Sequence, residues 1–127
     1  WRRRTSSIEL GPTSTAIVLA HRLGCVVAAT GAIDFVTDGE RVAEPANGAE
    51  LMTRVTAVGC ALSGVVAAFA ALTPERFLAA AAATAIYGVA GEMSAERAKG
   101  PGAFRVAFLD ALDAIDEADI ARRLKVA

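Results

Sequence analysis

The chain has 127 residues, the size of one ordinary domain with a single hydrophobic core. Its 13 basic and 14 acidic side chains leave a formal net charge of -1, so no clustered basic surplus is present for nucleic acid. The one basic run, Arg2 to Arg4, is short and terminal, and we interpret it as a solvated end.

Two cysteines and one histidine are present, and their positions argue against zinc. Cys25 and Cys60 lack metal-ligand spacing, and His21 has no partner at helical distance. No apolar segment with a small-residue cleavage site follows Trp1. The sequence therefore predicts no side-chain metal site and a cytoplasmic protein with reduced thiols.

The first elements follow from glycine positions and apolar periodicity. Residues 1–12 have no periodicity and are expected to be irregular, while 13–127 form the folded unit. A helix is predicted from Thr13, with Gly24 placed to end it. The unbroken apolar run Cys25–Ala29 then indicates a buried strand of an α/β layer.

A hairpin is predicted next, at a sheet edge. Ile33–Val36 and Arg41–Ala43 flank Asp38-Gly39, and Asp-Gly between β-prone residues is the strongest short hairpin signal. Leu51–Val55 is expected to form a further short strand.

Helices fill the rest of the chain. An uncharged helix is expected from near Gly59 to the break at Thr73-Pro74-Glu75, and a second helix runs from there toward Lys99. Acids precede bases between Asp116 and Lys125, as the dipole of a short helix favours. Between these segments lies one apolar helical stripe made by Phe104, Ala107, Phe108, Ala111, Leu112 and Ile115.

A membrane hairpin is an alternative for the two uncharged runs. Val55–Pro74 has the length of about 20 residues that a membrane-spanning helix needs. Its composition is mostly Ala, Val, Gly, Ser and Thr, which makes insertion only weakly favourable, and Phe77–Gly91 is rich in alanine too. Alanine-rich helices are also typical of the layers packed on a parallel sheet.

Two short segments could carry chemistry. Val55–Cys60 is a turn that leads into a helix, whose first N–H groups form an anion site and stabilise the thiolate of a cysteine placed there. A buried cysteine in a small-residue turn is the competing interpretation. Thr30 follows a predicted strand at its carboxyl end, where open α/β sheets bind ligands, although it could merely end the strand. His21 is expected on the surface, and Asp38 has a turn role that needs no catalysis.

Several blocks resemble hydroxyethylthiazole kinases. Thr30–Gly39, with the letters TGAIDFVTDG, is similar to the family's Thr-Gly-Glu-(Val/Ile)-Asp-Tyr-Val-(Thr/Ser)-Asp-Gly segment. Further blocks follow in the family's order and spacing from about Thr13 to the C-terminus. They are Asn47-Gly48, Leu51–Thr56, Gly59–Ser63, Tyr87–Glu92 and Gly100–Phe104.

The resemblance implies the C-terminal part of a ribokinase-like three-layer α/β/α kinase. Family members phosphorylate the hydroxyl of 4-methyl-5-(2-hydroxyethyl)thiazole with ATP and Mg2+, and they work as trimers. Thr30 matches the family's ATP-contacting threonine, and Cys60 matches the cysteine at the catalytic-base position. Ala57, Val58 and Gly59 match the turn that holds the substrate and the transferring phosphoryl group.

Three departures from the family pattern accompany the match. Ala57 stands where the family has a glycine, so a Cβ will cost binding if that position needs a positive φ. Ala32 replaces the acidic residue of the Thr-Gly-Glu block. The family's first half, with the thiazole pocket and most of the central sheet, has no counterpart here, and exposed apolar patches are expected. A catalytically inactive, oligomerising α/β fragment therefore stands as the alternative function.

Overall fold

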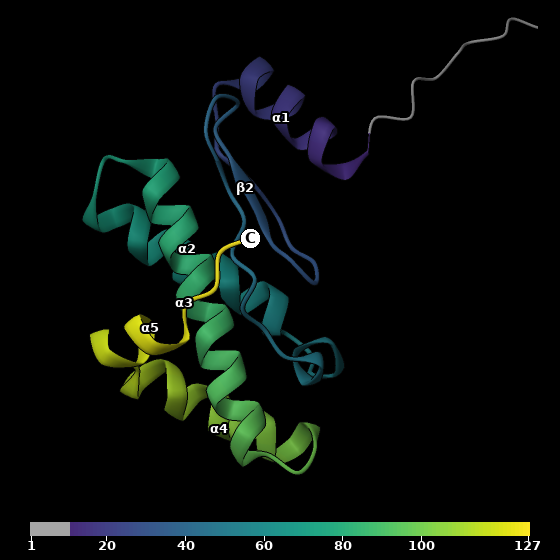
Figure 1. Ribbon diagram of the computed structural model, residues 1–127, viewed down its shortest axis with the longest axis vertical. Coiled ribbons are helices and arrows are strands. Elements are labelled where there is room, and N and C mark those ends of the chain that lie inside the picture. The colour runs from purple at the N-terminus through teal and green to yellow at the C-terminus, as the bar shows by residue number, and fades with distance from the viewer. Residues whose placement is uncertain (1–10) are drawn as a thin grey trace, which may run out of the picture.

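The computed structural model describes residues 11–127 as a small sheet and a set of helices arranged around one long helix, α3 (Figure 1). Five α-helices and one antiparallel sheet in these residues agree with the expected few strands, one hairpin and four to five helices. The elements are α1 Pro12–Leu23, β1 Val27–Ala29, β2 Phe35–Thr37, β3 Val42–Ala43, η1 Glu50–Arg54, α2 Val58–Leu72, α3 Arg76–Arg97, α4 Pro101–Ala114 and α5 Glu117–Arg123.

The first helix ends where its sequence predicted. Gly24 is left-handed, with φ 61°, and its N–H donates to the carbonyl of Ala20. The helix begins at Pro12 rather than Thr13, because proline at the first helical position needs no N–H partner. The expectation for residues 1–10, including the run from Arg2 to Arg4, lies outside the described residues.

The sheet has three strands in the order β1-β2-β3, and both pairings are antiparallel. β2 and β3 form the predicted hairpin, in which Val36 pairs with Ala43. Asp38 shapes the turn, since its Oδ1 accepts hydrogen bonds from the backbone N–H groups of Glu40 at 3.0 Å and Arg41 at 2.7 Å. The backbone and side-chain hydrogen bonds from Arg41, and to a smaller extent the bond from Glu40, lower the pKa of the Asp38 carboxyl to about 2.

The first strand is less buried than its apolar run suggested. β1 covers only Val27–Ala29, and Ala28, in its middle, is exposed. β2, in contrast, is buried at all three of its positions. The prediction of a buried strand at Cys25–Ala29 is therefore wrong in burial, since the face of β1 that carries Ala28 is exposed.

Leu51–Val55 does not form the predicted strand. The segment is the 3-10 helix η1, Glu50–Arg54, and Val55 alone is extended. Thr53 stabilises this turn, because its hydroxyl donates to the carbonyl of Glu50 at 2.8 Å. A short apolar run does not distinguish a strand from a helical turn, and here the local side-chain bond favours the turn.

Helix α3 forms the centre of the core. It packs against α2, α4, α5 and β2, and twelve of its residues are buried. Tyr87 of α3 meets Phe108 of α4 edge to face at 4.8 Å between ring centroids, and Phe104 stacks on Phe108 at 5.5 Å. The expected apolar stripe of α4 is confirmed as core through Phe104, Phe108 and Ala111.

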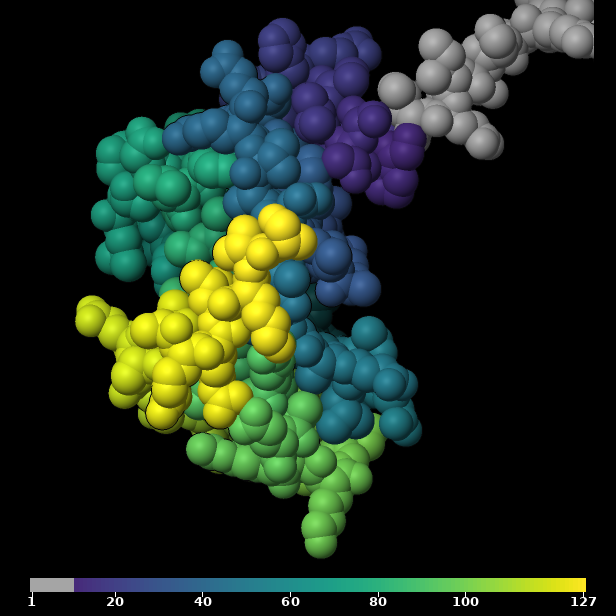
Figure 2. Space-filling model, viewed as in Figure 1, coloured from purple at the N-terminus to yellow at the C-terminus, as the bar shows by residue number. Residues whose placement is uncertain are grey.

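The C-terminal segment crosses back over the molecule. The N–H of Ala46 donates to the carbonyl of Lys125 at 2.9 Å, and the N–H of Ala127 donates to Glu44 at 3.0 Å. The space-filling view shows this segment, in yellow, lying on both the helices and the loop after β3 (Figure 2). The end of the chain thereby fixes the loop that leads from the sheet to η1.

One helix in residues 11–127 has the length and composition to cross a membrane. It is α3, with a mean hydropathy of 1.3 over its best window, but 67 % of that window is buried inside the structure. α2, which contains most of the uncharged run Val55–Pro74, has only 15 residues. Burial by other parts of the same chain is typical of a core helix, so the structure does not favour the membrane hairpin.

Candidate active site

A cavity of about 800 Å³ lies between the end of β1, the loop before η1 and the start of α2. It is lined by Thr30, Gly31, Ala32, Asp34, Asn47, Gly48, Ala49, Glu50, Met52, Thr53, Val55, Val58, Gly59, Leu62, Tyr87 and Gly88. Five of the blocks that resemble the kinase family contribute residues to it. A second recess, of about 570 Å³, lies beside the hairpin turn, where Arg41 is already paired with Asp38 at 2.7 Å.

The start of α2 presents free backbone donors beside this cavity. Ala57 precedes the helix in a left-handed conformation, with φ 73°, and its carbonyl accepts the N–H of Ala61 at 2.8 Å. The N–H groups of Val58, Gly59 and Cys60 come before that bond, so the helix gives them no acceptor. Together with the helix dipole they form a site suited to an anion.

Tyr87 fixes this first turn from the core side. Its side chain is buried, and its hydroxyl donates to the carbonyl of Val58, the first residue of α2. Burial is the main cause that raises the pKa of Tyr87 to about 12, and the nearby Cys60 adds to this effect. The phenol therefore stays protonated and remains a donor. The turn is therefore held by a hydrogen bond from α3 as well as by its own helix.

The loop after β1 is held in shape by Asp34. The backbone N–H of Gly31 donates to Asp34 Oδ1 at 2.9 Å, which draws the loop 30–34 into a tight turn. Partial burial raises the pKa of the Asp34 carboxyl, and the bond from Gly31 lowers it in part. This turn places Thr30 at the wall of the cavity.

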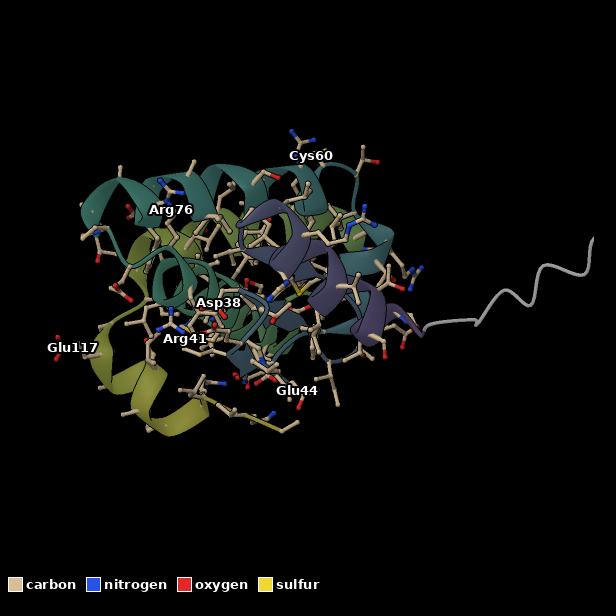
Figure 3. All side chains as sticks on the ribbon, turned by 90° about the horizontal axis from the view of Figure 1, so that it is seen from above. Asp38, Arg41, Glu44, Cys60, Arg76 and Glu117 are labelled. Atoms are coloured by element: carbon tan, nitrogen blue, oxygen red, sulfur yellow. The ribbon has the colours of Figure 1, made fainter. Side chains whose placement is uncertain are left out.

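The structure brings together three of the five residues singled out in the sequence. Thr30, Val58 and Gly59 all line the cavity, although they come from segments far apart in the chain. Ala57 and Cys60 flank the turn but are not among the lining residues. Cys60 is a free, exposed thiol in the first turn of α2 (Figure 3), so the interpretation of a buried structural cysteine is wrong.

The charges around the cavity do not match a phosphate group by themselves. Among the described residues the lining includes the carboxylates of Asp34 and Glu50 but no lysine or arginine. Within residues 11–127 no three His, Cys, Asp or Glu side chains gather as metal ligands do.

Two structural residues of the site were not singled out from the sequence. Tyr87 is one, and Asn47 is the other: Asn47 is buried and its backbone touches α3 at Gly88. A Cβ on Gly88 would collide with the carbonyl of Asn47, so glycine is required for this approach. The signal was present, because both residues belong to blocks that resemble the kinase family.

Known proteins resemble the chain along most of its length. The model of the hydroxyethylthiazole kinase family matches residues 5–118. The chain belongs to this family. A hydroxyethylthiazole kinase of Cereibacter sphaeroides strain ATCC 17029 is 56 % identical over 108 residues, which are 82 % of this chain and 41 % of that relative. One from Zea mays is 40 % identical over 123 residues, or 96 % of this chain and 44 % of the relative.

A solved structure has the same fold in its matching part. The hydroxyethylthiazole kinase protein of Pyrococcus horikoshii OT3 superposes with a TM-score of 0.87 and 38 % identity, over 91 % of this chain and 45 % of that one. The predicted family and ribokinase-like α/β fold are thereby confirmed. The chain spans less than half the length of each of these three relatives.

Proposed function

We propose that this chain forms the phosphate-holding part of a hydroxyethylthiazole kinase, which transfers a phosphoryl group from ATP to the hydroxyl of 4-methyl-5-(2-hydroxyethyl)thiazole in thiamine biosynthesis. One observation carries the proposal. In a chain of this family, Thr30, Val58 and Gly59 line the same cavity, which supports a site for the phosphate groups there.

Each residue of the turn has a role in the proposed transfer. Thr30 hydrogen-bonds the ATP phosphates, and the N–H groups of Val58, Gly59 and Cys60 hold the transferring phosphoryl group. Ala57 sets the direction of these groups and borders the alcohol. The Cys60 thiolate accepts the proton of the substrate hydroxyl as its oxygen bonds to phosphorus, while the bond to ADP breaks.

Magnesium is the expected companion of ATP in this family, and its role is to neutralise phosphate charge. Asp34 and Glu50 are the carboxylates at the cavity that remain to interact with a hydrated ion carried by the nucleotide.

With this activity we propose a cytoplasmic kinase that assembles as a homotrimer. We expect no nucleic-acid or membrane partner. The alternative is a catalytically inactive fragment that oligomerises. The absence of lysine and arginine from the described lining of the cavity favours this alternative. Thermal stabilisation by ATP separates the two, because a ligand that binds only the folded state raises its stability.

The decisive experiment is transfer of labelled phosphate from ATP to hydroxyethylthiazole by the purified chain. Cys60→Ala is run beside it, and His21→Ala, a substitution of another exposed side chain, is the matched control. Turnover that survives in His21→Ala and collapses in Cys60→Ala supports the kinase and the role of Cys60. A folded sample that neither turns over nor is stabilised by ATP supports the inactive fragment.

A further inference from the structure

Asn47 is the only residue of the sequence with a side-chain amide, because the chain contains one asparagine and no glutamine. It is buried, with 5 % of its surface exposed. Both ends of its amide bond the C-terminal segment: Nδ2 donates to the carbonyl of Arg123, and Oδ1 accepts the N–H of Lys125, each at 2.7 Å. The amide therefore loses both partners together when that segment detaches.

An asparagine that precedes glycine is chemically labile, and Gly48 follows Asn47. The backbone nitrogen of Gly48 loses its proton and attacks Cγ of Asn47, which closes a five-membered succinimide, while the bond to Nδ2 breaks and ammonia leaves with a proton. Water then opens the ring at either carbonyl, so the product is aspartate or isoaspartate, with water consumed and ammonia released. Gly48 has no side chain beside its nitrogen, and even a Cβ there would meet only the Met52 sulfur, at 4.0 Å.

The folded structure opposes each step of this reaction. Nδ2, the leaving group, is bonded to Arg123, and Oδ1 is bonded to Lys125, so the amide cannot rotate to bring Cγ to the nitrogen of Gly48. The N–H of Gly48 donates to Glu92 Oε1 at 3.3 Å, and a carboxylate at this place opposes loss of the proton. Asn47 is therefore protected as long as the C-terminal segment lies on its loop.

The C-terminal segment can open without the core. It lies over the helices and the loop after β3 (Figure 2), where the N–H of Ala46 donates to Lys125 at 2.9 Å and that of Ala127 donates to Glu44 at 3.0 Å. Lys125 and Ala127 are themselves exposed. An exposed segment held by a few hydrogen bonds opens at a lower free energy than the packed helices unfold.

We infer that Asn47 is a modification site controlled by the C-terminal segment: the amide is stable while residues 123–127 lie on the loop, and it deamidates through a succinimide when they detach. This inference goes beyond the proposed function and does not depend on it, because the reaction needs only water and the chain itself.

The modification prevents the segment from returning. Aspartate at position 47 places an oxygen opposite the carbonyl of Arg123, where the amide had a donor. Isoaspartate routes the backbone through the former side chain, which displaces the carbonyl that lies against Gly88 of α3. Residues 47–50 all line the cavity, so deamidation opens one wall of it irreversibly.

The test compares deamidation of Lys125→Pro with that of Lys125→Ala. Both variants lose the ion pair with Glu92, but only proline lacks the N–H that Asn47 accepts. Leu124, the preceding residue, has a ψ of 127°, which is the extended conformation that a following proline favours. In mildly alkaline buffer we expect Lys125→Pro to deamidate roughly tenfold or more faster than Lys125→Ala. Intact mass measures the reaction, because no other residue of the sequence carries an amide that could become a carboxyl group.

Equal rates for the two variants overturn the inference when faster amide exchange at Ala46 shows that Lys125→Pro has released the segment. The unchanged chain decides if this variant does not fold or keeps the segment in place. Its deamidation rate should rise with urea as amide exchange at Ala46 does, and not as exchange at Val89, a fully buried residue of α3, does. A rate that follows Val89, or that urea does not change, shows that the C-terminal segment does not control the site.

Discussion

Ala57 holds a backbone conformation that its side chain opposes. It is the only non-glycine residue of positive φ in residues 11–127, with φ 73°. A Cβ in this region approaches the following carbonyl, which costs roughly 1–2 kcal/mol for an L-residue and nothing for glycine. We expect Ala57→Gly to raise the free energy of unfolding by about 1 kcal/mol, measured by urea denaturation.

Ala61→Gly, the same alanine-to-glycine change four residues after Ala57, is the control. Ala61 is exposed and lies inside α2 with ordinary helical geometry, so Ala61→Gly should lower the free energy of unfolding by about 1 kcal/mol. Opposite signs for the two variants support the strain at Ala57. Two losses of similar size would show that the left-handed conformation costs nothing.

Tyr87 gives a second residue-scale prediction. Tyr87→Phe keeps the ring against Phe108 and removes the hydroxyl that donates to Val58. We expect a loss of about 1 kcal/mol in unfolding free energy and faster amide hydrogen exchange in the first turn of α2. Thr84→Val is the control, because the Thr84 hydroxyl bonds within α3, to Ala80 at 2.8 Å. If Tyr87→Phe left amide exchange in the first turn of α2 unchanged, the Tyr87 hydroxyl would not hold that turn in place.

The site was predictable from the sequence only where its signals are local. A threonine after a strand and a turn that leads into an uncharged helix indicated Thr30, Val58 and Gly59, and all three line one cavity. No local pattern indicated Tyr87, because its bond joins residues 29 positions apart, and only its place in a block that resembles the kinase family marked it. The left-handed φ of Ala57 was anticipated only through the family's glycine at that position.

At the scale of elements, the contact between α3 and the loop after β3 depends on Gly88. A Cβ at this position would meet the carbonyl of Asn47, a backbone atom that cannot move aside as a flexible side chain does. We expect Gly88→Ala to lower the free energy of unfolding by about 3 kcal/mol, although alanine is the better helix former. Thermal and urea denaturation both measure this change.

Gly64 supplies the matched control for that helix substitution. It lies in the middle of α2, and a Cβ there would meet nothing within 4 Å. Gly64→Ala should therefore raise the free energy of unfolding by about 1 kcal/mol through helix propensity alone. A gain at both glycines would mean that α3 and the loop do not approach closely.

Elements whose ends are marked by glycine, proline or turn residues were predictable from the sequence. Elements whose conformation or burial depends on neighbouring segments were not. Gly24, the Asp38-Gly39 turn and the break before Glu75 each marked a boundary that the structure confirms within one or two residues. Leu51–Val55 was misread because a short apolar run fits a strand or a turn equally well. The burial of β1 was misread because it depends on what lies beside the strand, which the strand's own residues do not encode.

At the scale of the whole molecule, Asn47 joins the middle of the chain to its end. Its side-chain amide donates to the carbonyl of Arg123 at 2.7 Å, and its Oδ1 accepts the N–H of Lys125 at 2.7 Å. Asn47→Ala removes both bonds, so we expect a loss of about 2 kcal/mol in unfolding free energy. The C-terminal segment should also detach locally, and amide exchange at Ala127 and Ala46 should accelerate.

Glu92→Gln tests whether these bonds or a surface ion pair hold the C-terminal segment. The variant removes the pair with Lys125, whose nitrogen lies 2.9 Å from Glu92 in an exposed position, and keeps an acceptor for the N–H of Gly48. An exposed pair contributes about 0–1 kcal/mol, so Glu92→Gln should leave exchange at Ala127 nearly unchanged. If it released the segment as fully as Asn47→Ala, electrostatic attraction rather than the buried amide would hold the loop beside the cavity.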